Sequence, residues 1–166
     1  MAILDILVYP DPRLAQISSP VEKFDDELLS FIFDLEETMR AGPPSVGIAA
    51  PQVGHFERIV LVDVSSNPNI PNHGRLTLIN PNILYKQGSM VGREGCLSVP
   101  EYTGNVSRAE KITLQALNNE GRSLNYTMEG FEARAVQHEI DHLDGLLFLD
   151  RLVSRRSSLF IRKVYK

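Results

Sequence analysis

Residues 138–142 of this chain read H-E-I-D-H, and this stretch constrains the fold more than any other. In a helix, side chains four positions apart lie on one face, so His138 and His142 can bind the same metal ion. Glu139 lies beside the first imidazole and is free to handle protons. Gly145 follows as a helix stop signal. We therefore expect residues 130–143 to form a metal-binding helix around which the rest of the chain is arranged.

A catalytic metal needs a third protein ligand and an open position. Phe148 stands where one large class of zinc peptidases has its last histidine, and no glutamate follows Glu139 to serve a second class. The remaining candidates are two aspartates after the motif and three upstream residues, namely Asp144, Asp150, His55, His73 and Cys96. Thiolate is the strongest of these ligands, so we favour Cys96. For His55 and His73 we expect exposed loop positions.

Composition limits the possible classes of protein. The 166 residues contain no repeat and no long linker, so we expect a single domain spanning residues 1–166. A formal net charge of −4 gives no basic patch for nucleic acid. No apolar run reaches the roughly 18 residues of a membrane span, and the first residues lack the pattern of a leader. We expect a cytoplasmic protein without a nucleic-acid or membrane partner.

Hydrophobic periodicity and turn residues predict the elements of the fold. A helix begins at Asp25 or Asp26 and ends at Gly42, with its apolar face in the core. Residues around Asn118 predict the turn of a hairpin. The expected strands are residues 59–64, 76–80, 83–91, 111–117 and 123–128, and a short basic helix is expected over residues 154–165. The fold class is therefore α+β, with mainly antiparallel sheets packed around the central metal-binding helix, an N-terminal helix and a short C-terminal helix.

The segment of residues 42–54 contains glycines, prolines and small apolar side chains, which disfavour regular structure and allow close backbone approach. Gln52 is its only long polar side chain. A buried glutamine needs partners, and these could equally be backbone groups or a ligand. We expect this segment to lie against a pocket.

Three segments of the chain resemble the signature motifs of peptide deformylases. They are S-V-G-I-A-A-P-Q at residues 45–52, E-G-C-L-S at residues 94–98 and Q-H-E-I-D-H at residues 137–142. Their order and spacing match the family, and the similarity extends over nearly the whole chain. Each motif alone is moderately specific, whereas all three in order are very specific.

The resemblance implies a role for each matching residue. It implies that Cys96, His138 and His142 bind the metal and that Glu139 is the catalytic acid and base. It implies that Gln52 and the backbone N–H of Leu97 stabilise the oxyanion. The segments that flank the bound peptide, which lies in the cleft as an added strand, include Val46, Gly47, Ile48 and Gly95.

The same resemblance implies removal of the formyl group from N-formylmethionyl nascent polypeptides, with release of formate. It implies one divalent metal ion, with Fe(II) native in the family and Zn(II) or Ni(II) as alternatives. Whether the reaction takes place at the ribosome exit is left open. Two other functions are also left open: a zincin-type metallopeptidase with a third ligand other than Cys96, and a non-enzymatic protein that binds N-termini.

The sequence leaves the roles of Ser45 and Arg134 open. Ser45 stands where the first motif usually has glycine, which leaves the geometry of the loop and the substrate preference open. Arg134 lies one turn before His138. It could face the methionine pocket, but its place in the sequence favours an exposed side chain.

Overall fold

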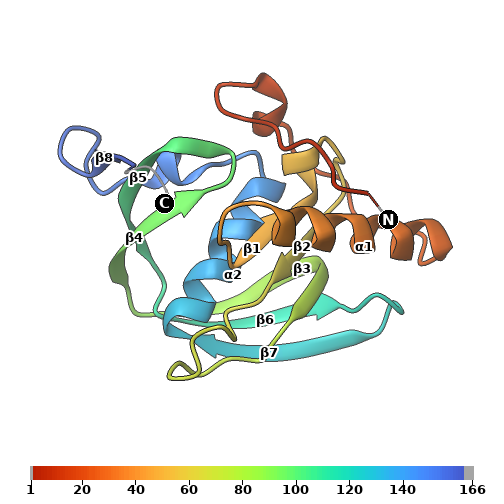
Figure 1. Ribbon diagram of the computed structural model, residues 1–166. Helices are drawn as coiled ribbons and strands as arrows, with labels where there is room; N and C mark the ends of the chain where they lie inside the picture. Colours follow the sequence, from red (N-terminus) through yellow and green to blue (C-terminus); the bar gives the residue numbers. More distant parts are fainter. Residues whose placement is uncertain (1, 163–166) are drawn as a thin grey trace.

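The computed structural model describes residues 2–162 and contains two sheets and two α-helices within that range (Figure 1). The helices are α1 (Asp26–Ala41) and α2 (Gly130–Leu143). A five-stranded antiparallel sheet has the order β1-β2-β3-β6-β7, and a three-stranded antiparallel sheet has the order β4-β5-β8. Their bounds are β1 Gly47–Ala49, β2 Ile59–Val62, β3 Leu76–Gln87, β4 Met90–Cys96, β5 Val99–Arg108, β6 Lys111–Leu117, β7 Ser123–Glu129 and β8 Leu159–Ile161. The predicted α+β class with antiparallel sheets is confirmed.

Helix α1 begins and ends where the sequence predicts. The side chain of Asp25 caps its first turn by accepting a hydrogen bond from Leu28 N–H at 3.0 Å, and Gly42 follows its last residue. Its buried face packs on one side of the five-stranded sheet, in a cluster that includes Ile59 and Leu61 of β2. The helix therefore covers one face of the sheet and takes no part in the motifs.

Strand β2 is buried on both faces. Ile59 and Leu61 point toward α1, whereas Val60 and Val62 belong to a second cluster with residues of α2. Successive side chains of a strand point to opposite faces, so this continuous apolar run requires a layer on each side. The two helices therefore lie on opposite faces of the sheet.

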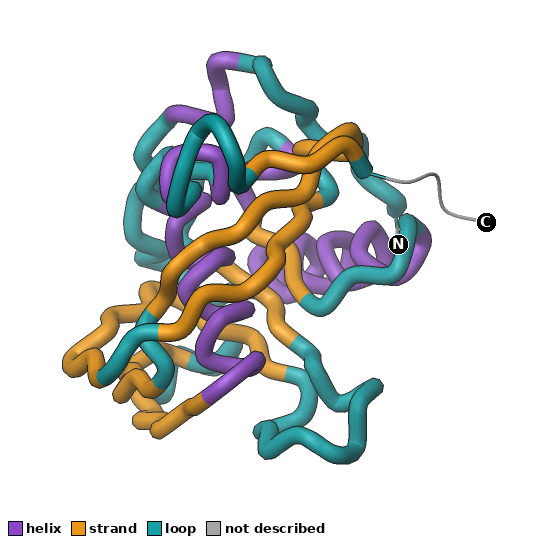
Figure 2. Tube along the Cα trace, turned by 90° about the vertical axis from the view of Figure 1, so that its left-hand side faces the viewer, coloured by secondary structure: helices purple, strands orange, loops and turns teal. Residues whose placement is uncertain are grey.

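Helix α2 lies between the two sheets. Val136, Ile140 and Leu143 pack on the five-stranded sheet, and Arg134 and His138 form hydrogen bonds with β4 of the other sheet. In Figure 1 the helix runs through the centre of the molecule, and Figure 2 shows long strands crossing in front of it. This position explains why the helix is buried nearly all round.

The C-terminal end of α2 is closed by a Schellman motif. Gly145 has a φ of 77° and its N–H donates to the carbonyl of His142 at 3.2 Å, while Leu146 N–H donates to the carbonyl of Asp141 at 2.9 Å. A Cβ on Gly145 would lie 2.3 Å from the carbonyl oxygen of Ala15. Only glycine therefore lets the segment before α1, the N-terminal arm (residues 2–24), pass so close to the end of this helix.

The 111–129 hairpin is confirmed, but the predicted break at residues 80–82 is wrong. Strand β3 continues through Asn80, which has a φ of 50°, and its register with β6 shifts there. The side chain of Asn80 accepts from Val21 N–H at 2.8 Å and donates to the Val21 carbonyl at 3.0 Å. The strand therefore accommodates Pro81, which has no N–H to donate, by forming a β-bulge. The hydrogen bonds between Asn80 and Val21 of the N-terminal arm support this bulge.

The short basic helix predicted for residues 154–165 is wrong for the described part of that segment. Residues 159–161 form strand β8, whose Phe160 pairs with Thr103 of β5. Asn105 N–H also donates to the carbonyl of Ser158 at 2.9 Å. The open edge of β5 satisfies the backbone of this segment, which outweighs its helical pattern. The last residues of the predicted helix, 163–165, lie outside the described residues.

The 42–54 segment is more regular than predicted. It contains the short strand β1 and a 3-10 turn, η2 (Ala50–Val53), which is followed by Gly54 with a φ of 79°. Two other 3-10 turns, η1 (Pro12–Ala15) and η3 (Phe148–Arg151), lie in the N-terminal arm and after α2. Neither α-helix of the described chain has the length and apolar composition needed to cross a bilayer.

Two glycine substitutions test how the end of α2 is held. Gly54→Ala should cost about 1 kcal/mol of unfolding free energy, because Gly54 has a positive φ but open space around its Cα. Gly145→Ala should cost about 1–3 kcal/mol more, because its new Cβ also meets the backbone of Ala15. Urea unfolding of both variants measures the difference, and equal losses would contradict the proposed steric conflict.

Candidate metal centre

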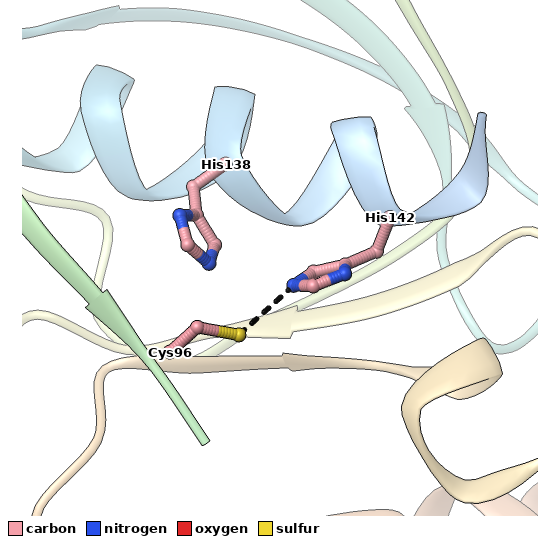
Figure 3. Close-up of side chains that lie close together, drawn as sticks. All are labelled: Cys96, His138 and His142. Carbon is pink, nitrogen blue, oxygen red and sulfur yellow. Dashed lines mark hydrogen bonds between the residues drawn. The ribbon is translucent and has the colours of Figure 1, made fainter. Parts of the chain in front are cut away.

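His138 and His142 project from one face of α2 toward Cys96, the last residue of β4 (Figure 3). One ligand atom from each of the three side chains lies within 4.8 Å of the others, and the Sγ of Cys96 is 3.3 Å from Nε2 of His142. All three side chains are buried. Burial lowers the pKa of His142 well below its ordinary value, so this ring is neutral, the form that binds a metal.

A tight turn delivers Cys96 to this cluster. Cys96 pairs with Val99 across Leu97 and Ser98, which connect β4 to β5. Phe148, at the position that argued against the zinc peptidase class, is fully buried and packs in the same hydrophobic cluster as Cys96. The position that a third histidine would occupy in the zinc peptidase motif is therefore filled by the buried apolar side chain of Phe148.

The other candidate ligands lie elsewhere. His55 stacks on Phe31 with ring centroids 3.8 Å apart, and its Nε2 is 2.6 Å from Glu57. The Nδ1 of His73 is 2.6 Å from the buried carboxylate of Glu132. Both histidines lie in loops with partly exposed side chains, as expected, and each is also held by an acidic partner. Among the described residues, the cluster of three potential ligands contains Cys96 and neither of these histidines.

Glu94, for which no role was predicted from the sequence, supports the cluster from behind. The Nδ1–H of His138 donates to its Oε1 at 2.8 Å. Arg108 donates two further hydrogen bonds of 2.8 Å each, and Arg134 donates one of 2.6 Å. Burial alone would raise the pKa of Glu94, but the bonds from Arg108 and His138 outweigh it and hold the pKa far below its usual range. Glu94 is therefore a buried carboxylate that orients one imidazole.

One sequence signal could have identified this residue. Glu94 and Cys96 are two positions apart in a strand, so their side chains share one face of β4. If Cys96 faces the histidines, Glu94 does too. Its two arginine partners carry no such signal, because they lie 14 and 40 residues from it in the sequence.

Arg134 is buried, so the exposed position that we favoured for it is wrong. Besides its bond to Glu94, it donates to the carbonyl of Val106 at 3.0 Å and to that of Met90 at 2.5 Å. Its side chain also lines the cleft described below. The hydrogen bonds to three acceptors on β4 and β5 provide the reason, because they compensate for the loss of water around the guanidinium.

Glu139 lies beside the cluster with one carboxylate oxygen buried and without a hydrogen-bond partner. That oxygen, Oε1, is 4.0 Å from Nε2 of His142. Burial raises the pKa of Glu139 to about 7. A Cβ on Gly47 would lie 2.6 Å from its Oε2, so a glycine there is needed to make room for this carboxylate.

The donor set fits a divalent cation. A cysteine sulfur and two imidazole nitrogens are typical ligands of Fe(II) and Zn(II), and three protein ligands leave a position open for water. The buried oxygen of Glu139 without a partner supports the same conclusion, because such an atom is costly unless a positive charge or a water molecule compensates it. The cluster could therefore hold a metal ion and activate water.

Gln52 reaches this centre from η2. Its Oε1 accepts a hydrogen bond from Ala49 N–H at 2.8 Å, which orients the amide. Its Nε2 donates to Ser98 Oγ at 3.0 Å and to Cys96 Sγ at 3.4 Å. Of the two outcomes considered for this glutamine, the backbone partner is observed at its oxygen, and its nitrogen is bonded to the side chains of Ser98 and Cys96.

A cleft of about 470 Å³ opens onto these residues. It is lined by residues of all three motifs, and these include Val46 and Gly47, Gly95 and Leu97, and His138 and Glu139, with Ser45 and Arg134 also contributing. Ile48 is not among the lining residues, because its side chain is fully buried under α1. The structure thus brings the three sequence motifs together around one cleft.

Replacing Glu94 should show how strongly the support behind the cluster is coupled to folding. Glu94→Ala leaves Arg134 buried without its carboxylate and Arg108 with Asp141 alone, and we expect a loss of about 3–5 kcal/mol of unfolding free energy. Glu36 is a matched control, because it too pairs with two arginines, but at the surface. For Glu36→Ala we expect a loss of about 1 kcal/mol or less. Denaturant unfolding measures both, and similar losses would contradict a special role for burial.

Comparisons with known proteins agree with the geometry. The family model described as polypeptide deformylase matches residues 3–158. The chain is 46% identical to a peptide deformylase of Alkalilimnicola ehrlichii, over 100% of this chain and 91% of that protein. It is 43% identical to one of Syntrophobacter fumaroxidans, over 98% of this chain and 94% of that protein.

Solved structures show the same similarity. A peptide deformylase from Legionella pneumophila superposes with a TM-score of 0.85 and 41% identity, covering 93% of this chain and 89% of that one. One from Thermotoga maritima superposes with a TM-score of 0.85 and 37% identity, covering 93% and 100%. On the basis of the matched model, the full-length relatives and the shared structure, this chain belongs to the polypeptide deformylase family.

Proposed function

We propose that Cys96, His138 and His142 hold one divalent metal ion at which the protein removes the formyl group from N-terminal formylmethionine. One observation carries this assignment: the only partnerless buried carboxylate oxygen among the described residues, that of Glu139, lies beside a buried cluster of one sulfur and two imidazoles. The donor set suits Fe(II), Zn(II) and Ni(II), and the family resemblance favours Fe(II) as the native ion.

When bound, such an ion supplies Lewis-acid activation of a water molecule. Glu139 accepts the proton that this water loses as it attacks the formyl carbon. It then delivers the proton to the leaving amine nitrogen, so that formate and a free N-terminus are produced. A pKa raised to about 7 by burial is well matched to both halves of this transfer.

Charge that develops on the formyl oxygen needs hydrogen-bond donors. We assign this role to Nε2 of Gln52 and to the backbone N–H of Leu97. Ala49 fixes the orientation of the Gln52 amide, so its donor end is already aimed at the cluster before substrate arrives. Preorganised donors of this kind each contribute roughly 3 kcal/mol of transition-state stabilisation.

The peptide part of the substrate would lie between two backbone segments. We propose that Val46, Gly47 and Gly95 contact it along the walls of the cleft. Ile48 can contribute through its backbone alone, because its side chain is buried in the core. An extended peptide suits this arrangement, since strand β1 is at the edge of its sheet.

The substrates that we propose are N-formylmethionyl nascent polypeptides, which places the reaction in the cytoplasm where such chains are made. The family match over residues 3–158 supports one deformylase domain for the whole chain. The activity requires no direct contact with nucleic acid. Contact with the ribosome exit would bring the cleft to its substrate, and we leave it as a hypothesis.

Glu139→Gln should separate chemistry from metal binding. We expect anaerobic formate release from formyl-Met-Ala-Ser to fall by roughly 10²–10⁴-fold after loading with Fe(II), Ni(II) or Zn(II), because the proton acceptor is lost. Metal content should not change. Glu132→Gln is the control, since Glu132 is equally buried on α2 but pairs with His73. Full activity of the Glu139 variant would rule out this mechanism. Absence of formate release from the unaltered, metal-loaded protein would instead favour a protein that only binds N-termini.

Cys96→Ala tests the third ligand. We expect the bound metal per protein chain to fall sharply when it is measured by elemental analysis after dialysis, because two imidazoles alone hold a cation weakly. His55→Ala and His73→Ala should keep their metal, since both rings lie outside the cluster. A zincin-type peptidase would use another third ligand, so undiminished metal in Cys96→Ala would favour that alternative.

A further inference from the structure

Strand β1 presents an open edge to the cleft. It is the terminal strand of the five-stranded sheet and pairs only with β2. The carbonyl of Val46 accepts a hydrogen bond from Asp63 N–H at 2.8 Å, on the β2 side. Backbone groups of successive strand residues point to alternate sides, so the N–H and C=O of Gly47 point away from β2. Gly47 also lines the cleft beside Glu139.

The side chain of Ser45 occupies both of these edge groups. Its hydroxyl donates to the carbonyl of Gly47 at 2.8 Å, and the N–H of Gly47 points back to the same oxygen at 3.4 Å. The next group along this edge, Ala49 N–H, is bound by Gln52. Two side chains therefore cover an edge that would otherwise be free to pair with another chain.

We propose that the Ser45 hydroxyl competes with extended peptides for the backbone groups of Gly47 and so sets the affinity of the cleft for them. We call this displaceable hydroxyl the plug. In the free protein it satisfies Gly47, and when a peptide backbone pairs with Gly47 the hydroxyl rotates about its Cα–Cβ bond into solvent. This inference rests on the proposed function, because it assumes that formylated peptides bind along β1. A glycine at this position would leave the edge open, which gives the departure from the family motif a physical consequence.

The expected effect follows from the net strength of one hydrogen bond. A peptide that binds must replace the intramolecular bond from Ser45, whereas without the hydroxyl it replaces only water. The difference corresponds to about a two- to tenfold change in dissociation constant. Pro43 and Pro44 precede Ser45 and limit the backbone of this loop independently of the hydroxyl. Loss of the hydroxyl should therefore affect affinity more than loop position.

Calorimetric titration tests the proposal without turnover. In a Glu139→Gln background loaded with Zn(II), we expect formyl-Met-Ala-Ser to bind about two- to tenfold more tightly when Ser45→Ala is added. Ser89→Ala is the control, because Ser89 is an exposed serine outside the cleft, and it should leave the affinity unchanged. Thermal unfolding confirms that each variant is folded. In the otherwise unaltered enzyme, Ser45→Ala should lower KM by the same factor and leave kcat unchanged.

Unchanged or weaker binding by the Ser45→Ala protein would overturn the plug, whether or not formate is released. Tighter binding without formate release from the unaltered enzyme would instead support the plug and remove the proposed function. A fall in kcat with no change in affinity would also overturn the plug, because it would mean that Ser45 positions the reacting groups. The two proposals can therefore fail separately.

Discussion

The carboxylate of Glu94 is the interaction on which the rest of the site depends. It accepts the Nδ1–H of His138, so Nε2 is the nitrogen of that ring that is left to bind a metal ion at the cluster. The same carboxylate is held by Arg108 from β5 and by Arg134 from α2. One buried group thus fixes the tautomer of a candidate ligand and joins the three-stranded sheet to the central helix. A metal site whose ligands come from two distant segments needs such a coupling, because neither segment alone sets the distance between sulfur and imidazole.

Arg108 extends this coupling along the helix. It donates to Asp141 at 2.6 Å, and Arg151 from η3 bonds the same carboxylate. Buried ion pairs of this kind give little net stability, because desolvation offsets most of their attraction. Their contribution here is geometric. They hold one face of α2 against β4 and β5, while the apolar residues on the opposite face supply most of the free energy that binds the helix to the larger sheet.

Local signals predicted some elements of this fold and failed for others. Both helices were predicted to within a residue of their ends, because Asp25, Gly42 and Gly145 mark those ends chemically. Strand β3 was divided wrongly, since its continuity depends on a side chain bonding Val21, 59 residues away. Strand β8 was missed because the open edge of β5, and not its own sequence, decides its conformation. At the site, the motifs predicted which residues meet, whereas the ion pairs behind them could not be predicted, because pairing across the fold leaves no periodic pattern.

The N-terminal arm shows why a segment without any motif can still matter to the site. Within it, Leu7 N–H donates to the carbonyl of Gln52 at 2.7 Å and Tyr9 N–H donates to that of Ser98 at 2.8 Å. These two acceptors lie on the two segments that carry the proposed oxyanion donors. Gln52 also bonds Ser98 directly. The segment that carries Gln52 and the segment that carries Leu97 are therefore connected twice, once by the backbone of the arm and once by the Gln52 side chain. These connections keep both proposed donors in place while the open edge of β1 exchanges partners.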